Sequence, residues 1–394
     1  NGYIFDARER FSLSLGGALN TVPGLELGLF EMCIGDVRKV IVPPALGFGR
    51  RGSKVFGVPP DATLEYTITM RAINLQEDPN VRRRDLDDER LTAAGQVWPQ
   101  ARATKDYNEM LAPGDLDLVI VATMPNTHEA MSLASLEAGA NVLCEKPFMM
   151  NAAEAQNVLA KAKMANLRVQ LGTNMRYMTG SQYLHDLVTN GTIGTPVYAK
   201  AWGCHDYPPV WGPHYHLATS GGGVLASTLV HTLDLAMWIG GSPNPLTVSA
   251  ATNRLFPGKR GPKVDAKIHE RYDAEDLLSA FVRFDNGAFY SLEGNWCSEA
   301  KDYHSFELTT TKATVTGAPF SVKVDVEGEI IDQTPTLDGN DDWLKSVQTQ
   351  DAALIGRLRA GAPWDVQDAR QLLNLQKIVD ACYESAHTGR EVVL

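Results

Sequence analysis

The sequence is poor in several features that would assign it to a special class of proteins. Its five cysteines are scattered over 394 residues and form no Cys-x-x-Cys pair, which indicates reduced thiols in a reducing compartment. It lacks any run of about 18 apolar residues, so we expect no transmembrane helix. The formal net charge is -11, which argues against nucleic acid or an anionic membrane as the main partner. We therefore expect a cytoplasmic protein.

Metal-ligand patterns with a recognisable spacing are also absent. Asp85, Asp87 and Glu89 begin like a calcium loop, but Arg90 and Gln96 stand where such a loop needs Gly and Glu. A second candidate is a proline-rich stretch that contains Cys204, His205, Asp206, His214 and His216. Its spacing fits no strong zinc motif. We interpret it as a substrate-facing loop and expect no metal site.

The sequence contains two parts that differ in their pattern of predicted strands and helices. In residues 1–76, short β-rich runs between Gly and Pro turns predict a small antiparallel sheet with one helix at 23–30. The charged residues 77–90 are typical of a linker. Strands and amphipathic helices then alternate, which predicts an incomplete Rossmann-like parallel sheet at 91–173 and an α+β domain at 174–394. The fold class is therefore α+β and α/β. The β-rich runs are 11–15, 37–42 and 63–73.

In the second part, from about residue 91 onward, the predicted strands and helices follow one another in a regular order. The continuous apolar run LDLVIVAT (116–123) is typical of a buried parallel strand. Helical periodicity follows it. The predicted elements are then a helix at 127–140, a strand at 141–146, a helix at 151–165 and a strand at 167–173. Strand-rich segments follow at 196–204, 246–252, 277–297 and 305–331, before a closing helix at 368–386.

The stretch ALGFGRRG (45–52) contains the Gly-x-Gly-x-x-Gly spacing of the dinucleotide-binding fingerprint. The fingerprint needs a helix directly after the glycines, because the pyrophosphate lies on the helix N-terminus. Here Gly57, Pro59 and Pro60 follow instead and forbid a helix. This stretch is therefore not a cofactor site.

A succession of short motifs marks the first segment. They are FD (5–6), VPG (22–24), RKVIVPP (38–44), GFG (47–49) and PPDATL (59–64). With them the segment resembles FKBP-type peptidyl-prolyl isomerases. The resemblance implies an apolar pocket that binds prolyl peptides and twists a peptide bond whose barrier is about 18–20 kcal/mol. Its lining would be Phe5, Asp6, Phe11, Thr21, Val22, Leu25, Phe48, Val58 and Tyr66. Leu25 and Phe48 stand where the family usually has Trp and Tyr.

A longer resemblance covers the chain from about residue 81 to its end. The blocks LDLVIVATMPNTHEAMSLASLEAGANVLCEKP (116–147) and GGGVLASTLVHTLDLAMWIGG (221–241) are similar to those of Gfo/Idh/MocA-type oxidoreductases. The resemblance implies NAD or NADP as the cofactor. It implies a polyol, a sugar or a related small hydroxyl compound as the substrate. It also implies a homo-oligomer formed through the sheet of the C-terminal domain.

Hydride transfer needs a cation near the substrate and a general base, and the resemblance supplies candidates. Lys146 would polarise the substrate, His231 would accept the alcohol proton, and Asp234, one helical turn on, would orient His231. The nicotinamide and its ribose would be lined by Thr123, Asn126, His128, Glu145 and Pro147, with Asp85 at the adenosine ribose. The substrate would contact Arg176, Tyr177 and His214.

Departures from this family leave alternatives open. Ser227 stands where the family often has Asp, and the first strand, glycine-rich loop and first helix of a 3-2-1-4-5-6 sheet are absent, which leaves a sheet edge open. One alternative is a prolyl isomerase with a non-catalytic oxidoreductase-like appendage. Another is a non-catalytic fusion or fragment. A hydrolase built on Ser220 or Ser227 with His231 would lack the Gly-x-Ser-x-Gly elbow.

Overall fold

The computed structural model describes residues 37–43, 58–59, 61–69, 82–84, 91–92, 102–209, 214–256, 258, 266–299, 303–337, 343–362 and 366–394. Contacts divide the chain into two compact units, Asn1–Lys105 and Asp106–Leu394. This division lies later in the chain than the predicted boundaries at 76 and 90.

The first unit contains an antiparallel pair of strands. β1 (Val37–Val42) and β2 (Leu64–Thr69) place Val40 opposite Tyr66. The β-branched runs at 37–42 and 63–73 predict both strands, and both are confirmed. Val58, a predicted pocket residue, is buried, as are Val42 and Leu64. The other pocket residues, Phe5, Asp6, Phe11, Thr21, Val22, Leu25 and Phe48, lie outside the described residues, so the prolyl pocket stays a prediction.

A second pair of strands begins within the predicted linker. β3 (Arg82–Arg84) and β4 (Arg102–Thr104) pair in parallel. Residues 82–84 thus form a strand that the sequence did not predict. Three arginines carry little β-propensity, and the partner strand lies too far along the chain for a local pattern to reveal it. Asp85, which follows β3 directly, lies outside the described residues.

The second unit opens with the predicted parallel sheet. Its strands are β5 (Leu118–Val121), β6 (Asn141–Cys144) and β7 (Val169–Leu171), side by side in that order. The helices between them are α4 (His128–Glu137), preceded by the turn η3 (Pro125–Thr127), and α5 (Ala152–Ala165). The side chain of Asn151 caps α5 by accepting the N–H of Glu154 at 3.0 Å. Asn166 ends that helix in the left-handed conformation. Helix α3 (Tyr107–Leu111) precedes the sheet.

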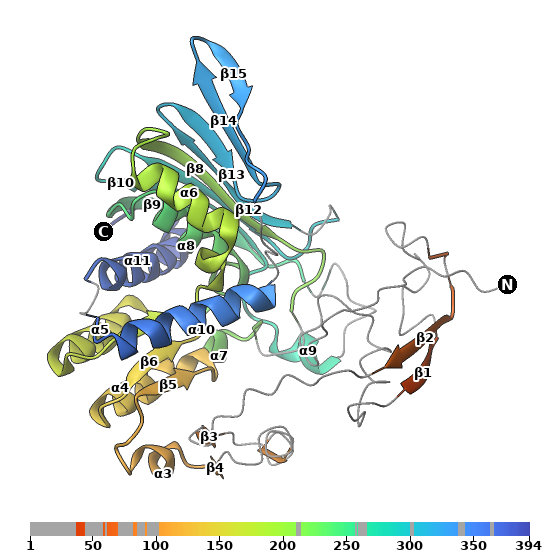
Figure 1. The fold of residues 1–394 in the computed structure, drawn as a ribbon, viewed down its shortest axis with the longest axis vertical. Coiled ribbons are helices and arrows are strands. Elements are labelled where there is room, and N and C mark those ends of the chain that lie inside the picture. Colours follow the sequence, from red (N-terminus) through yellow and green to blue (C-terminus); the bar gives the residue numbers. More distant parts are fainter. Residues whose placement is uncertain are drawn as a thin grey trace. The chain divides into compact units, whose positions relative to one another are not determined.

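A nine-stranded sheet forms the larger part of this unit (Figure 1). The spatial order is β15-β14-β13-β12-β8-β11-β10-β9-β16, with every pair antiparallel except β8 and β11. The strands are β8 (Pro196–Cys204), β9 (Pro245–Asn253), β10 (Leu277–Phe284), β11 (Phe289–Asn295), β12 (Tyr303–Thr310), β13 (Ala313–Thr316), β14 (Ser321–Val326), β15 (Glu329–Asp332) and β16 (Val392–Val393). The α+β domain expected from residue 174 onward thus has a mixed sheet.

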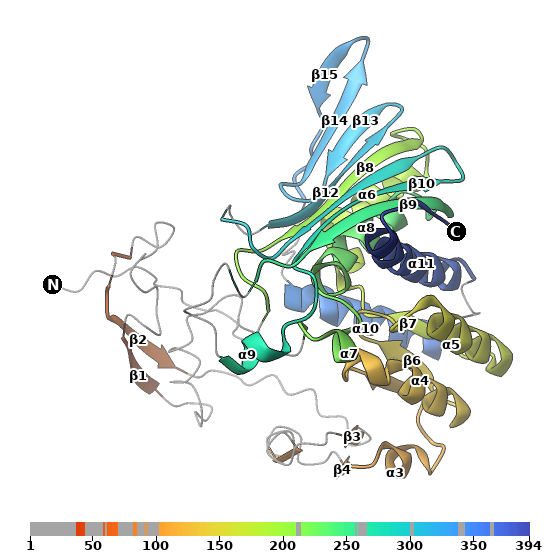
Figure 2. The same ribbon diagram turned by 180° about the vertical axis from the view of Figure 1, so that it is seen from behind.

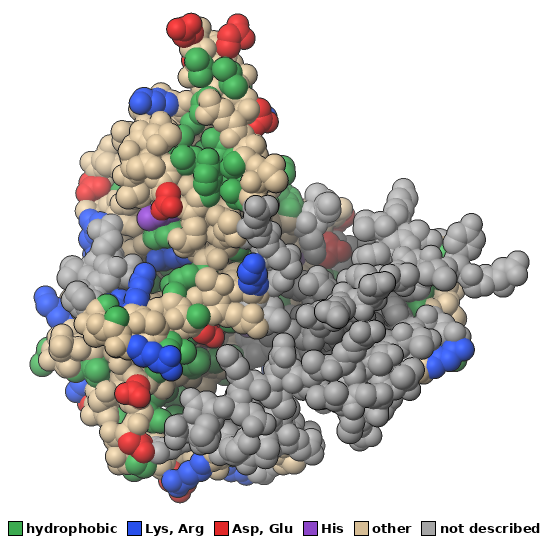
Figure 3. Space-filling view, in the orientation of Figure 1, with side chains coloured by type: hydrophobic (Ala, Val, Ile, Leu, Met, Phe, Trp, Pro, Cys, Tyr) green, Lys and Arg blue, Asp and Glu red, His purple; other side chains and the backbone are tan. Residues whose placement is uncertain are grey.

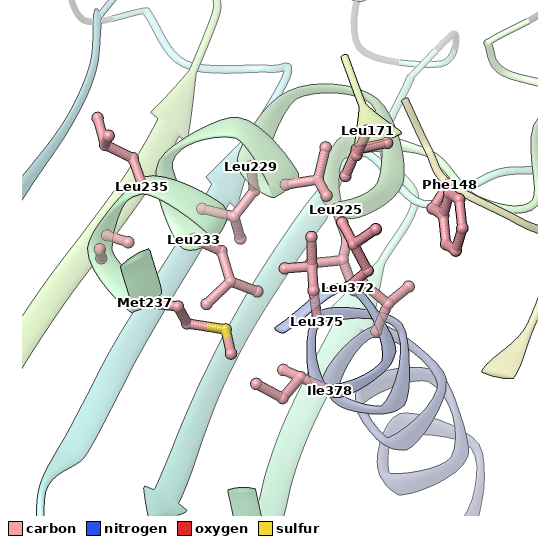
Figure 4. Packing of buried hydrophobic residues seen from close by; sticks show 14 of the residues in the cluster. Phe148, Leu171, Leu225, Leu229, Leu233, Leu235, Met237, Leu372, Leu375 and Ile378 are labelled. Atoms are coloured by element: carbon pink, nitrogen blue, oxygen red, sulfur yellow. The ribbon is translucent and has the colours of Figure 1, made fainter. Parts of the chain in front are cut away.

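Helices pack on one face of this sheet, and the view from behind leaves the other face open (Figure 2). α8 (Val230–Ile239) lies against β8 and β12, and α11 (Val366–Thr388) lies against β9. Leu229 and Leu233 meet Leu375 and Ile378 between these helices (Figure 4). The remaining helices are η4 (Asn174–Tyr177), α6 (Thr179–Thr189), α7 (Leu217–Ser220), η5 (Leu225–Leu229), α9 (Ala266–Arg271) and α10 (Trp343–Arg359).

The hairpin of β14 and β15 extends beyond the helices and reaches the top of Figure 3. Ile330 near its tip is 77 % exposed. Two neighbouring apolar side chains on the hairpin, Val326 and Ile331, are also exposed.

One helical segment bears on the expectation that the chain has no transmembrane helix. Leu217–Ile239 meets that test by length and composition, but 89 % of its most apolar window is buried inside the protein. A helix that is apolar on all sides is also what the core of a large domain requires. Its apolar character is explained here by packing between the sheet and α11.

Candidate active site

Lys146 lies just beyond the carboxyl end of β6. Its Nζ donates a hydrogen bond of 3.0 Å to the main-chain carbonyl of Ser227. Burial lowers the pKa of the Lys146 ammonium, and the neighbouring Glu145 carboxylate acts in the opposite sense. A lysine in this setting gives up a proton more readily than an exposed one. It stands at the edge of the sheet where open α/β folds bind their ligands.

Ser227 lies in an irregular helical turn. η5 is a π-helix that leads directly into α8, which carries His231 near its start. Single π turns are rare and occur frequently at functional sites. The hydroxyl of Ser227 lies 3.4 Å from Nδ1 of His214. Ser227 therefore connects two candidate residues, since its carbonyl binds Lys146 and its side chain meets His214.

The start of this helical segment is held by a buried carboxylate. Glu275 accepts the N–H groups of Gly223 and Leu225 at 2.7 and 3.0 Å, which places negative charge at a helix N-terminus. A Cβ on Gly223 would come within 1.8 Å of the Glu275 carbonyl oxygen. Only glycine permits this close approach, which explains part of the glycine run at 221–223.

The imidazole of His231 is kept neutral by its surroundings. Burial is the main cause that lowers its pKa well below 6.5, and the nearby Lys146 and His304 add to the effect. Its ring meets the indole of Trp343 edge to face, with centroids 5.4 Å apart. A neutral imidazole can accept a proton, which is the property that the sequence assigns to this residue.

A second neutral imidazole lies in the same region. Burial, followed by the nearby Lys146, lowers the pKa of His214 to about 4. Lys146, His214, Ser227 and His231 thus form one group, although they come from separate parts of the chain. Three of them were candidates in the sequence. Ser227 was noticed as a departure from the family pattern and as one of two possible hydrolase serines, and no sequence signal marks its carbonyl as a lysine acceptor.

Asp234 has a different partner from the one predicted. Both oxygens of its carboxylate accept hydrogen bonds from the guanidinium of Arg176, at 2.7 and 2.5 Å. Asp234 is 1 % exposed and Arg176 is buried with it. This buried ion pair was not predicted, and the orienting role of Asp234 toward His231 and the substrate contact of Arg176 stay predictions. The hydroxyl of Tyr177 accepts a hydrogen bond of 3.0 Å from Gln170.

His128 is also placed differently from the prediction. It is 0 % exposed, so it cannot line a ligand surface. Its Nδ1 lies 3.0 Å from the carbonyl of Pro147, and its Nε2 lies 3.1 Å from the carbonyl of Thr123. The ring therefore ties together the two loops that follow β5 and β6.

The remaining cofactor candidates lie on these two loops. Thr123 pairs with Thr127 through their hydroxyls at 2.7 Å. Asn126 is exposed. The carboxylate of Glu145 accepts the N–H of Lys146 at 3.2 Å. Their roles toward a cofactor stay predictions.

Three family models match the chain. Residues 77–173 match the oxidoreductase family with an NAD-binding Rossmann fold, and residues 181–316 match the GFO/IDH/MocA C-terminal domain. Residues 77–173 and 181–316 are thus similar to the two domains of the Gfo/Idh/MocA oxidoreductases. The Rossmann match supports NAD(P) as the cofactor. Residues 1–71 match the FKBP-type peptidyl-prolyl cis-trans isomerase model.

Curated relatives of the Gfo/Idh/MocA part are sugar and polyol dehydrogenases. D-glucoside 3-dehydrogenase of Escherichia coli is 28% identical over 316 residues, which are 78% of this chain and 88% of that protein. D-apiose dehydrogenase of Paraburkholderia graminis is 25% identical over 298 residues, which are 76% of this chain and 72% of that protein. Myo-inositol 2-dehydrogenase of Thermotoga maritima is 31% identical over 157 residues, which are 40% of this chain and 46% of that protein.

Two solved structures of other proteins share the fold. GenD2 from gentamicin A biosynthesis, in complex with NAD, aligns with a TM-score of 0.64 at 23% identity, over 80% of this chain and 88% of that chain. Levoglucosan dehydrogenase, in complex with NADH and levoglucosan, aligns with a TM-score of 0.69 at 18% identity, over 80% and 90%. At this identity the likeness supports the fold alone.

Proposed function

We propose that this chain is an NAD(P)-dependent oxidoreductase that converts a secondary hydroxyl of a sugar or cyclic polyol into a carbonyl. The observation that carries the proposal is the meeting of a buried lysine with two neutral imidazoles around Ser227. A hydrogen-bond donor and a proton acceptor at one place are what oxidation of an alcohol requires. The curated relatives support the sugar and polyol class.

The residues would divide the reaction between them. The ammonium of Lys146 donates a hydrogen bond to the substrate oxygen and stabilises the negative charge that develops there. His231 accepts the hydroxyl proton while the C–H bond gives up its hydride, so that the C–O bond becomes a C=O bond. The bound nicotinamide supplies the acceptor for that hydride. The Ser227 hydroxyl and His214 lie beside Lys146 and would bind a second substrate hydroxyl.

The residues present fit the nicotinamide end of NAD(P). Lys146 stands at the carboxyl edge of the parallel sheet, and the loops after β5 and β6 carry Thr123, Asn126 and Glu145. The sequence from 77 to 173 contains no Gly-x-Gly-x-x-Gly. We therefore expect weaker cofactor binding than a complete phosphate loop provides.

The first experiment is a titration of the purified full chain with NADH and NADPH, followed by nicotinamide fluorescence. We expect saturable binding at about 1 μM to 1 mM. A panel of methyl glycosides, inositols and open-chain polyols is then tested for reduction of NAD and NADP. The proposal fails if neither cofactor binds up to millimolar concentration, or if no member of the panel is oxidised.

A second candidate function belongs to the N-terminal segment. The match of residues 1–71 to the FKBP-type isomerase model favours prolyl cis-trans isomerisation, and the antiparallel pair of β1 and β2 is compatible with it. Uncatalysed isomerisation takes tens of seconds, so the full chain should shorten the relaxation time of a proline-containing peptide. An unchanged relaxation time at excess protein would remove this candidate.

A further inference from the structure

Trp343 is unusually placed for a large aromatic residue. It lies at the start of α10 and is 41 % exposed. Its ring meets that of His231 with centroids 5.4 Å apart and planes inclined by 78°. The same indole therefore contacts the residue proposed to accept the proton and presents a large part of its surface to solvent.

Despite this exposure, the indole is carried on a firmly held piece of backbone. Ser346 donates its hydroxyl to the carbonyl of Trp343 at 2.7 Å. Asn174 in turn donates its side-chain amide to the Ser346 hydroxyl at 2.8 Å. Asn174 and Ser346 are both buried. The start of α10 is thereby fixed to η4, the segment that follows the last strand of the parallel sheet.

We propose that Trp343 is the platform on which the apolar face of a ring-shaped sugar or cyclitol lies, with a rim hydroxyl directed to His231; this inference rests on the proposed function. Such a ring carries C–H groups on its faces and hydroxyls around its rim. An indole supplies a wide, rigid apolar surface at a low cost in side-chain entropy. Because the planes of the indole and of the His231 imidazole are inclined by 78° with centroids 5.4 Å apart, a sugar ring that lies flat on the indole beside His231 directs its rim to the imidazole.

The platform makes a prediction about substrate class. Pyranosides and inositols have a flat C–H face, whereas an open-chain polyol has none. Trp343 should therefore favour ring compounds over linear ones, while the hydrogen bonds of Lys146 and His231 are available to both. Specificity of this kind depends on shape and apolar contact and not on the count of hydroxyls.

The test measures binding without turnover. The dissociation constants of methyl β-glucopyranoside, myo-inositol and sorbitol are measured by calorimetry with the full chain, with Trp343→Ala and with Trp343→Phe. We expect Trp343→Ala to weaken the two ring compounds about tenfold or more, Trp343→Phe to retain most of the affinity, and sorbitol to be unaffected. Ile355→Ala is the matched control, since Ile355 lies on the same helix and is 39 % exposed.

The outcomes separate this inference from the proposed function. Equal affinity of wild type and Trp343→Ala for ring compounds, equal losses for rings and sorbitol, or no binding of any ring compound to the wild type would each overturn the platform. Trp343-dependent binding without reduction of NAD or NADP would support the platform and refute the oxidoreductase. If Trp343→Ala fails to fold, as seen in its melting curve, Trp343→Leu serves in its place, because leucine is apolar but offers no flat surface.

Discussion

Lys146 and Arg176 are two cations that bind the same helical segment, and they are bound in opposite ways. Arg176 forms a bidentate ion pair with Asp234. The bond described for the Lys146 ammonium goes to a neutral main-chain carbonyl. A cation paired with a carboxylate serves to position the elements that carry the pair. A buried cation that binds a neutral carbonyl can still stabilise negative charge on a ligand. Within one domain, Arg176 and Asp234 thus form a structural pair, whereas Lys146 is a reactive cation.

The largest effect is expected when the reactive cation is removed. Lys146→Met should lower kcat for sugar oxidation by about 10³-fold, because the developing negative charge loses its donor. The melting temperature should stay unchanged or rise, since methionine spares the cost of burying a charge. Lys161→Met, which removes an exposed ion pair with Glu137, is the control for activity. A loss smaller than tenfold for Lys146→Met would show that Lys146 does not contact the reacting oxygen.

Removing one partner of the structural pair should act on stability instead. Arg176→Met leaves the carboxylate of Asp234 buried without its partner, which should cost about 3–5 kcal/mol of unfolding free energy. Urea denaturation measures this loss of unfolding free energy. The double variant Arg176→Met with Asp234→Leu should recover most of the loss, because the uncompensated charge is gone. If the double variant is as unstable as the single one, the pair is not the source of the stability.

A smaller effect concerns pH. The pKa of His214 is about 4 in the folded protein and near 6.5 in the unfolded chain. Between these values the unfolded chain binds the extra proton, so this residue destabilises the fold as pH falls from 6.5 toward 4. His214→Gln should flatten the dependence of the urea midpoint on pH over that window. Equal slopes for the wild type and His214→Gln would contradict the burial of His214.

The smallest expected effect lies on the open face of the nine-stranded sheet (Figure 2). Tyr198, Phe289 and Phe281 form an aromatic row there, with centroids 5.1 and 5.5 Å apart. We propose that two copies of the chain associate through this face. Phe289→Glu should shift the sedimentation coefficient toward that of a monomer with little change in the melting temperature. A wild type that sediments as a monomer at all concentrations would end this proposal.

The local sequence pattern was sufficient to predict many strands and helices of the second unit. The run at 116–123 contains β5, and the helical periodicity at 151–165 matches α5, whose cap Asn151 is visible in the sequence. The strand β3 was missed because its residues are all arginine and its partner is distant. Helices α6 and α10 were not predicted, and Trp343, at the start of α10, was therefore not a candidate residue.

The sequence alone determined many of the strands and helices and the glycines that precede the His231 helix. These follow from periodicity and backbone sterics, which act over a few residues, whereas Lys146 and His231 became candidates through the family resemblance. Only the tertiary structure decided which charges pair. Arg176 lies 58 positions from Asp234, and Lys146 lies 81 positions from Ser227. Contacts over such separations depend on how whole elements pack, because a carboxylate one helical turn from His231 is buried against whichever element covers it.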